Sequence, residues 1–295
     1  MISCAHNIAI IRTNLSNVCV ILCINNLAHF KQALFQHLVF FLQCRHRVRQ
    51  LLPGFGLLAG FFLRGQLFGT RPIARGADSV MQLVVPLRAA YGASVPVKII
   101  TRVPQTPERY LKRLTLLVDK NPSPIAATLD LTPALGQADF ETRLRVDEYS
   151  HLRVIGELDN GALHMDSRYV KVSGGCSAPP NRSALHQIGK TQFRLPEGLH
   201  PGAVTPAEVS VVHPNDTGFE LNQVSLMYIP PHFVRRVQVA YAGQRLFDAE
   251  TDFSVSENPS WRFNFVPRER GLLTAEVEDT KDGRFTGSLD PWAAS

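Results

Sequence analysis

The first 77 residues of this 295-residue chain contain no aspartate or glutamate, and Asp78 is the first acidic residue. The same stretch carries 8 of the 31 lysines and arginines. Residues 78–295 hold the other 23 basic and all 25 acidic side chains, a net charge of −2, although the whole chain has +6. A nucleic-acid-binding domain needs lysine and arginine clustered on its folded surface. The charge of residues 78–295 therefore does not support a nucleic-acid partner.

Long apolar runs are also scarce at the N-terminus, where the run 18–24 is too short to span a bilayer. A second run, 51–63, follows a basic patch at 45–49, which is the outline of a secretory signal. This outline begins late in the chain, and no small-x-small cleavage site follows the run before Arg64. Three interpretations of residues 1–62 stay open: a degraded or misread export signal, a start site placed too early, and an unrelated apolar extension. A separate domain is the least favoured.

Cysteine is rare beyond that extension. Cys176 is the only cysteine after Cys44, so it has no disulfide partner within residues 63–295. The other four, Cys4, Cys19, Cys23 and Cys44, show no C-x-x-C spacing of a metal site.

The neighbours of Cys176 are Gly174 and Gly175 on one side and Ser177, Ala178 and two prolines on the other. Glycine leaves the backbone loose, and proline ends regular structure. A structural cysteine is usually buried among large apolar side chains, which this segment lacks. The sequence therefore predicts that Cys176 is a presented, reactive thiol on a mobile arm made of Gly174, Gly175 and Ser177.

Residues 63–295 contain no nucleophile–base pair, phosphate loop or metal motif. Polar turn residues in the segment 213–218 favour a strand-ending turn over a polar site. The period-two spacing of Trp261, Phe263 and Phe265 favours sandwich core over a binding stripe. We therefore expect no catalytic residue, no metal, no cofactor and no enzymatic activity. The histidines without close spacing, interpreted as scattered surface or packed side chains, are His151, His164, His186, His200, His213 and His232.

From about residue 80 the pattern changes to short β-type runs separated by turn residues. The run 140–146 alternates apolar and polar residues, as a strand with one wet face does. The turn at Asp159-Asn160-Gly161 is a strong hairpin signal. With no long amphipathic helix between them, seven runs predict an antiparallel β-sandwich, and they are 81–85, 95–101, 113–118, 125–131, 140–146, 152–158 and 168–172.

A second β-rich unit follows a linker that contains five prolines. Its expected strands are 208–212, 236–241, 245–247, 261–266 and 272–279, followed by one last strand. The prediction is an all-β chain with two immunoglobulin-like antiparallel β-sandwiches in tandem, preceded by an apolar N-terminal extension. The expected bounds are 1–62 for the extension, 63–176 for the first sandwich, 177–206 for the linker and 207–295 for the second sandwich.

Several blocks of the sequence match a known family. The segment 110–122, YLKRLTLLVDKNP, and the ending Gly174-Gly175-Cys176 resemble SoxY, the sulfur-carrier subunit of the thiosulfate-oxidising system. The second unit resembles its partner SoxZ. The order of the two units and the segment 63–73 resemble the fused SoxYZ-like carriers associated with quinoprotein alcohol dehydrogenases. The SoxZ-like blocks are His213-Pro214, Thr217-Gly218, Ile229-Pro230 and Glu257-Asn258-Pro259.

The resemblance implies a function. In the SoxY family, the cysteine holds sulfur intermediates covalently while other periplasmic enzymes oxidise and cleave them. Cys176 would be that carrier thiol, in the periplasm, and the SoxY-like and SoxZ-like units would contact each other. The implied partners are periplasmic sulfur-oxidation enzymes or c-type cytochromes, or a quinoprotein dehydrogenase. Lys171 and Arg182 are candidate cations to activate the thiol.

One departure from the family keeps an alternative open. The SoxY arm ends its chain with glycines on both sides of the cysteine, whereas here 119 residues follow Cys176. A thiol held at both ends cannot enter a narrow channel as a free tail does. The alternative is a thiol-independent accessory or docking module for a periplasmic quinoprotein (PQQ) alcohol dehydrogenase system.

Overall fold

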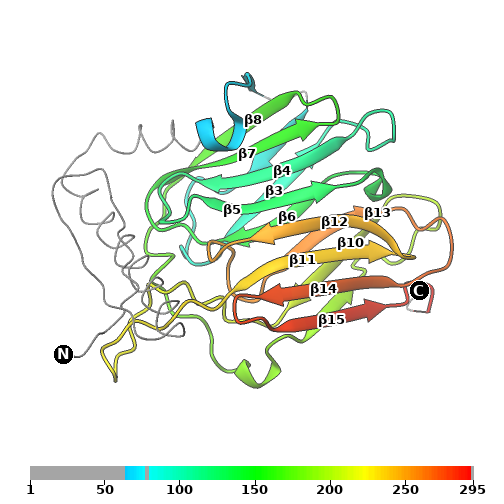
Figure 1. Cartoon of the computed structure of the whole chain (residues 1–295). Helices are drawn as coiled ribbons and strands as arrows, with labels where there is room; N and C mark the ends of the chain where they lie inside the picture. The colour runs from blue at the N-terminus through cyan, green and yellow to red at the C-terminus, as the bar shows by residue number, and fades with distance from the viewer. Residues whose placement is uncertain (1–63, 77–79, 294–295) are drawn as a thin grey trace, which may run out of the picture. The chain divides into compact units, whose positions relative to one another are not determined.

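The computed structural model describes residues 64–76 and 80–293 (Figure 1). The predicted extension, 1–62, lies outside the described residues. After one helical turn at 64–68, the described chain is built of strands and two short 3-10 helices, Pro133–Leu135 and Leu185–Gln187. No helix among these residues is long and apolar enough to cross a membrane.

The first half of the described chain, up to Cys176, contributes eight strands. Their bounds are β1 (Ile73–Arg75), β2 (Met81–Val84), β3 (Val95–Thr101), β4 (Leu111–Val118), β5 (Ile125–Leu131), β6 (Phe140–Leu144), β7 (Ser150–Leu158) and β8 (Leu163–Val170). The second half contributes seven, which are β9 (Thr191–Arg194), β10 (Thr205–Val211), β11 (Val234–Tyr241), β12 (Gln244–Thr251), β13 (Ser260–Phe265), β14 (Leu273–Asp279) and β15 (Arg284–Leu289).

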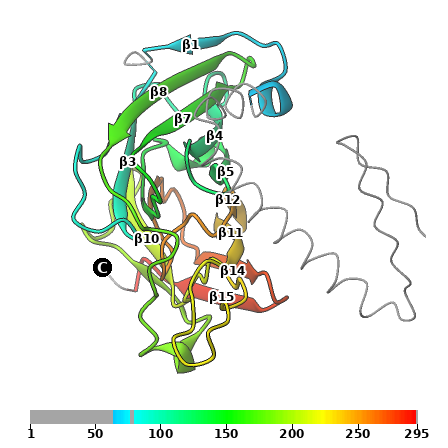
Figure 2. The same cartoon turned by 90° about the vertical axis from the view of Figure 1, so that its left-hand side faces the viewer.

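The strands form two sheets, as predicted for a sandwich. One sheet has the order β1-β8-β7-β4-β5-β12-β11-β14-β15, and the other has the order β2-β3-β6-β13-β10-β9. Figure 2 shows the strands of the larger sheet from β8 to β15 following one another. All strand pairs in these sheets are antiparallel except β1 with β8. The all-β, antiparallel fold class is therefore confirmed.

The two sandwiches share both sheets. Strand β5 of the first half pairs with β12 of the second over five residues, from Ala127 opposite Thr251 to Leu131 opposite Phe247. In the other sheet, Glu141 of β6 pairs with Arg262 of β13. The halves are thus joined through backbone hydrogen bonds as well as through the connecting segment.

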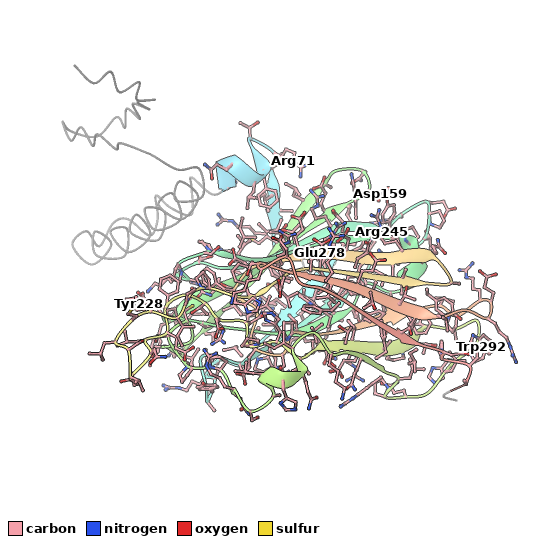
Figure 3. All side chains as sticks on the ribbon, turned by 60° about the horizontal axis from the view of Figure 1, so that its bottom comes forward. Arg71, Asp159, Tyr228, Arg245, Glu278 and Trp292 are labelled. Atoms are coloured by element: carbon pink, nitrogen blue, oxygen red, sulfur yellow. The ribbon has the colours of Figure 1, made fainter. Side chains whose placement is uncertain are left out.

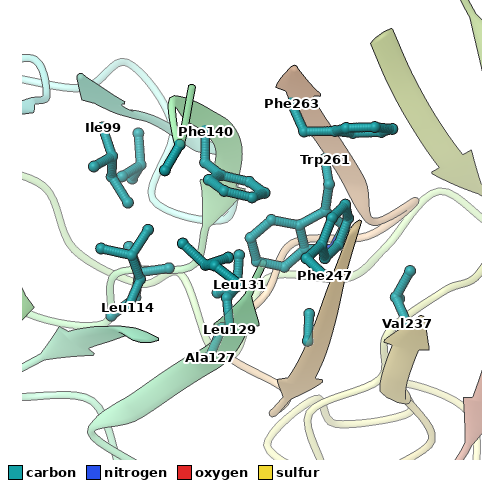
Figure 4. Packing of buried hydrophobic residues seen from close by; sticks show 14 of the residues in the cluster. Ile99, Leu114, Ala127, Leu129, Leu131, Phe140, Val237, Phe247, Trp261 and Phe263 are labelled. Atoms are coloured by element: carbon teal, nitrogen blue, oxygen red, sulfur yellow. The ribbon is translucent and has the colours of Figure 1, made fainter. Parts of the chain in front are cut away.

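Aromatic side chains pack in the interior where the two halves meet. Phe247 contacts Phe140 of the first half and Phe263 of the second, with ring centroids 5.3 and 5.1 Å apart (Figure 4). Trp261, Phe263 and Phe265 are at most 1% exposed, which confirms them as core. One hydrophobic cluster therefore runs through both halves.

Two strands escaped the sequence analysis. Strand β1 has three residues, and β9 lies inside the predicted linker. Because Phe193 of β9 pairs with Val209 of β10, the chain is folded from residue 191 onward. The predicted linker end at 206 is therefore wrong, and the strandless connection covers 171–190.

Candidate functional site

Cys176 lies just beyond β8, in the strandless connection between the halves, and is 1% exposed. Gly174 and Ser177 are exposed, whereas Gly175 and Cys176 between them are buried. It is the one free cysteine among the described residues. The predicted presentation of Cys176 on a mobile arm is wrong for this conformation, in which the thiol is enclosed.

The two glycines fix the segment in place. Gly174 has a φ of +74°, a conformation that residues with a Cβ rarely adopt. A Cβ on Gly175 would collide with the backbone carbonyl oxygens of Gly92 and Val146. The glycines therefore serve a left-handed turn and a close backbone contact, where the sequence analysis expected looseness.

Backbone hydrogen bonds hold the segment against the residues that follow β6. The N–H of Gly174 donates to the Asp147 carbonyl oxygen at 2.8 Å, and that of Gly175 donates to the Val146 carbonyl oxygen at 3.0 Å. The N–H of Cys176 donates to Oδ1 of Asp147 at 3.3 Å. Three successive amides are thus satisfied inside the protein, as buried amides require.

A buried arginine brackets the cysteine from both sides. Arg145 is 1% exposed, and its Nη1 donates to the carbonyl oxygens of Gly175 at 3.0 Å and Ala178 at 3.2 Å. Its Nη2 donates to the carbonyl oxygen of Asn215 at 3.4 Å, and its Nε has no hydrogen-bond partner. Sequence analysis missed this residue because the apolar–polar alternation of the run 140–146 places Arg145 on the wet face. Strand β6 ends at Leu144, so that alternation does not reach Arg145.

The loop 213–220 of the second half covers the segment. Thr217 Oγ1 donates to the carbonyl oxygen of Cys176 at 2.5 Å. Arg182 Nη2 contacts Oδ1 of Asp216 at 2.7 Å and Oε2 of Glu220 at 3.0 Å. Arg182 therefore links the strandless connection to this loop. The charged groups that act on the thiol are others, namely Arg145, Asp147 and Asp252.

These surroundings make the thiol a poor nucleophile where it lies. Burial raises the pKa of Cys176 far above its usual range, the nearby Asp147 carboxylate adds to this, and Arg145 opposes it. The nucleophile in cysteine chemistry is the thiolate. Cys176 is therefore protonated in this conformation at neutral pH, and it has to leave the enclosure before it reacts.

Asn121, within the segment 110–122, also makes internal contacts. Asn121 is fully buried, and its Nδ2 donates to the Arg145 carbonyl oxygen at 2.8 Å and to Ser254 Oγ at 2.9 Å. Its Oδ1 accepts the N–H of Asp147 at 3.0 Å. This amide therefore connects the first half to the second directly behind the cysteine segment.

Two histidines that the sequence suggested were scattered meet in space. The rings of His213 and His232 are 4.5 Å apart, and Asp279 Oδ2 lies 2.9 Å from Nε2 of His232 and 3.6 Å from Nε2 of His213. The loop 213–218 is strandless apart from one isolated bridge, consistent with the predicted turn, but it carries a buried polar cluster. Sequence spacing gave no signal because the three residues come from separate elements.

The hydrogen bonds of His213 decide what this cluster does. The N–H of Asn215 donates to its Nδ1 at 3.1 Å, so a neutral ring carries its proton on Nε2. A histidine that ligates a metal through Nε2 instead donates from Nδ1. Burial and the neighbouring His232 lower the pKa of His213 to about 4. As arranged, the cluster therefore positions protons near Asp279 and offers no lone pair on His213 Nε2 to a metal.

The loop 221–230, which has no charged side chain, projects beside the cysteine segment. Its side chains are strongly exposed, with Val224 at 95%, Leu226 at 71% and Met227 at 69%, and Tyr228 marks it in Figure 3. At its base lies a hollow of about 420 Å³ whose wall includes Ser177 and Arg182. The exposed Ser177 thus connects this surface to the enclosed thiol.

The comparisons with known proteins agree with the two halves. The family described as sulfur oxidation protein SoxY matches residues 64–176, and the family described as sulphur oxidation protein SoxZ matches residues 193–290. No curated protein matches the sequence.

Solved structures similar to the chain include two kinds. The sulfur carrier protein SoxY from Chlorobium limicola f thiosulfatophilum shares 26% identity over 41% of this chain and 96% of its own, with a TM-score of 0.34. A superoxide reductase (neelaredoxin) from Ignicoccus hospitalis shares 12% identity over 34% of this chain and 95% of its own, with a TM-score of 0.31. On the two family matches, the chain is a fusion of a SoxY domain and a SoxZ domain of sulfur oxidation proteins in one polypeptide.

Proposed function

We propose that this protein is a non-enzymatic periplasmic carrier that holds a sulfur-containing intermediate covalently on Cys176. The observation that carries the proposal is the position of the thiol. The SoxY match ends at residue 176, so the sole cysteine of the described chain is the last residue of that domain. No strand holds it, because β8 ends at Val170 and β9 begins at Thr191.

The enclosed thiol requires that the segment opens before it is loaded. The contacts to be broken are hydrogen bonds of Gly174, Gly175 and Cys176 with residues 145–147 and Thr217. A hydrogen bond contributes about 1 kcal/mol net. Opening therefore costs far less free energy than separating the two sheets, and carrier chemistry runs through a minor open form.

Loading from a polythionate needs no added oxidant. The Cys176 thiolate attacks a sulfane sulfur of tetrathionate, a new S–S bond forms, and thiosulfate leaves with the electron pair of the broken S–S bond. The product carries a thiosulfonate group on the cysteine, and a thiol reductant removes it again.

Incubation of the full chain with tetrathionate tests the proposal. We expect an adduct on the peptide that contains Cys176, reversed by reductant and absent in Cys176→Ser. Denatured protein in the same reagent gives the reactivity of the free thiol for comparison. A Cys176 that loads in denaturant but never in the native protein would refute the carrier function.

The second candidate function is a thiol-independent docking module for a periplasmic quinoprotein (PQQ) alcohol dehydrogenase. It is favoured by the enclosed thiol together with the exposed side chains of Val224, Leu226 and Met227. A cellular assay of dehydrogenase-dependent growth separates the two functions. Full growth with Cys176→Ser and loss of growth with Val224→Asp would support docking, and the reverse pattern would support the carrier.

A further inference from the structure

The surroundings of the Cys176 thiol disfavour a negative charge. Asp147 accepts the cysteine N–H through Oδ1, at 3.3 Å. Asp252, whose Oδ2 accepts a hydrogen bond from Ser123 Oγ at 2.8 Å, also acts on the thiol. Burial raises the pKa of Asp252 as well as that of Cys176. Arg145 is the one cation in the described chain that acts on the thiol, and its effect is opposed by those of Asp147 and Asp252.

The enclosure is also tightly packed. Gly175 has no space for a Cβ, and a Cβ on Gly92 would lie 2.6 Å from the Ser173 carbonyl oxygen. Thr217 closes the other side with its 2.5 Å hydrogen bond to the cysteine carbonyl. Because Cys176 is 1% exposed, a group added to its sulfur either takes room inside the protein or displaces the segment from these backbone contacts.

We infer that this enclosure closes only on the free, uncharged thiol, and that an anionic sulfur group attached to Cys176 holds the segment 174–178 outside. The inference rests on the proposed function and adds a regulation to it. An unloaded carrier hides its thiol from oxidants, whereas a loaded carrier stays presented. The reaction class that consumes the cargo is then one that acts on an exposed anionic S-sulfonate or thiosulfonate.

Two synthetic adducts of nearly equal length isolate the effect of charge. The Cys176 thiolate attacks the sulfenyl sulfur of a methanethiosulfonate, a disulfide forms, and methanesulfinate leaves. One reagent attaches a 2-sulfonatoethyl group, which is anionic, and the other a 2-hydroxyethyl group, which is neutral. Labelling of the full chain in mild denaturant followed by refolding places either group on Cys176, and the mass of its peptide confirms this.

Hydrogen exchange of the peptide spanning residues 171–184 is the measurement, because it contains the amides of Gly174, Gly175 and Cys176 that are bonded in the closed form. We expect these amides to exchange at least about tenfold faster in the sulfonatoethyl adduct than in the hydroxyethyl adduct, since exchange reports local opening. Unmodified protein should exchange most slowly. Equal exchange in the two adducts would overturn the inference.

Two variants serve as controls. Asp147→Asn keeps an oxygen for the Cys176 N–H but removes the charge, so it should slow exchange in the sulfonatoethyl adduct and leave the hydroxyethyl adduct unchanged. Gly175→Ala should open the segment in unmodified protein and so calibrate the fully open rate. Because the adducts are synthetic, a charge effect without tetrathionate loading would defeat the carrier function alone, and loading without a charge effect would defeat this inference alone.

Discussion

At the scale of single residues, the chemistry of Cys176 is set by what encloses it. The same thiol is a nucleophile in water and an inert group beside Asp147 and beneath Thr217, since ionisation in the enclosure costs desolvation. Arg145 is the residue that links the cysteine segment to both halves, through Gly175, Ala178 and Asn215.

Native labelling of Cys176 should therefore be at least about a hundredfold slower than labelling in denaturant, because only the open form exposes the thiolate. Gly175→Ala should restore most of the rate. Gly161→Ala is the control for a glycine substitution without a clash, since Gly161 lies in the β7–β8 turn with a φ of +82° and nothing within 4 Å of a Cβ. A fast native rate, or equal acceleration by both variants, would show that the thiol is not enclosed in solution.

The raised pKa of Cys176 also predicts a pH dependence of stability. The unfolded thiol ionises near pH 9.0 while the folded thiol stays protonated, so this stabilising contribution is full below pH 9 and is lost as pH rises above it. Wild-type protein should lose more free energy of unfolding between pH 7 and pH 10 than Cys176→Ser, by up to about 1.4 kcal/mol per pH unit above 9. Urea unfolding with reductant present measures the difference, and parallel curves would contradict it.

The lowered pKa of His213 predicts a loss of stability at acid pH. Its folded pKa of about 4 lies below the ordinary 6.5, so the unfolded chain gains a proton first and stability is lost as pH falls from 6.5 towards 4. His213→Gln should flatten this limb, whereas His186→Gln, at an exposed position, should not. Urea midpoints at pH 7, 5.5 and 4.5 give the comparison. If stability falls with pH as steeply in His213→Gln as in the wild type, a group other than His213 causes the loss.

At the scale of elements, the two halves pair through their edge strands, β5 with β12 and β6 with β13. In a sandwich that folded alone, these edges would be exposed to water. The joint of β5 with β12 leaves Phe247 between Phe140 and Phe263. Of the strands, β1 and β9 were missed because three or four residues carry too little period-two signal, and each depends on its partner strand for its assignment.

Phe247→Ala should cost about 3–5 kcal/mol in free energy of unfolding, the range for removal of a buried phenylalanine. Because its ring contacts both halves, we expect one shifted transition rather than unfolding of the second half alone. Phe285→Ala, in the last strand and only partly buried, is the control with the smaller loss. Circular dichroism and tryptophan fluorescence should give coincident curves, and separate midpoints would show independent halves.

At the scale of the whole described unit, the sequence predicted two sandwiches joined by a linker, and the structure joins them by two sheets as well. The described residues, 64–76 and 80–293, belong to one compact unit. Cleavage of the connection should therefore leave both halves together, since β5–β12 pairing and the shared core do not depend on it.

Limited proteolysis should cut first between residues 181 and 188, where most side chains are exposed, and not between 191 and 211, where β9 and β10 pair. The nicked protein should elute as a single species in size-exclusion chromatography and separate into two fragments only under denaturing electrophoresis. Early cuts within β10, or fragments that elute apart, would contradict the shared sheets.

Local pattern in the sequence determined most of the strands, the aromatic core and the position of a lone cysteine at the end of a SoxY-like unit, because alternation and family motifs are read along the chain. Tertiary structure alone decided that Cys176 is enclosed and that His213 meets His232 and Asp279. Desolvation and charge at a site depend on groups far apart in sequence, such as Arg145 and Thr217 around the thiol. A Gly-Gly pair is compatible with a loose arm and with a tight backbone contact. The tight contact is formed here because the backbone of Gly92 and Val146 lies against Gly175.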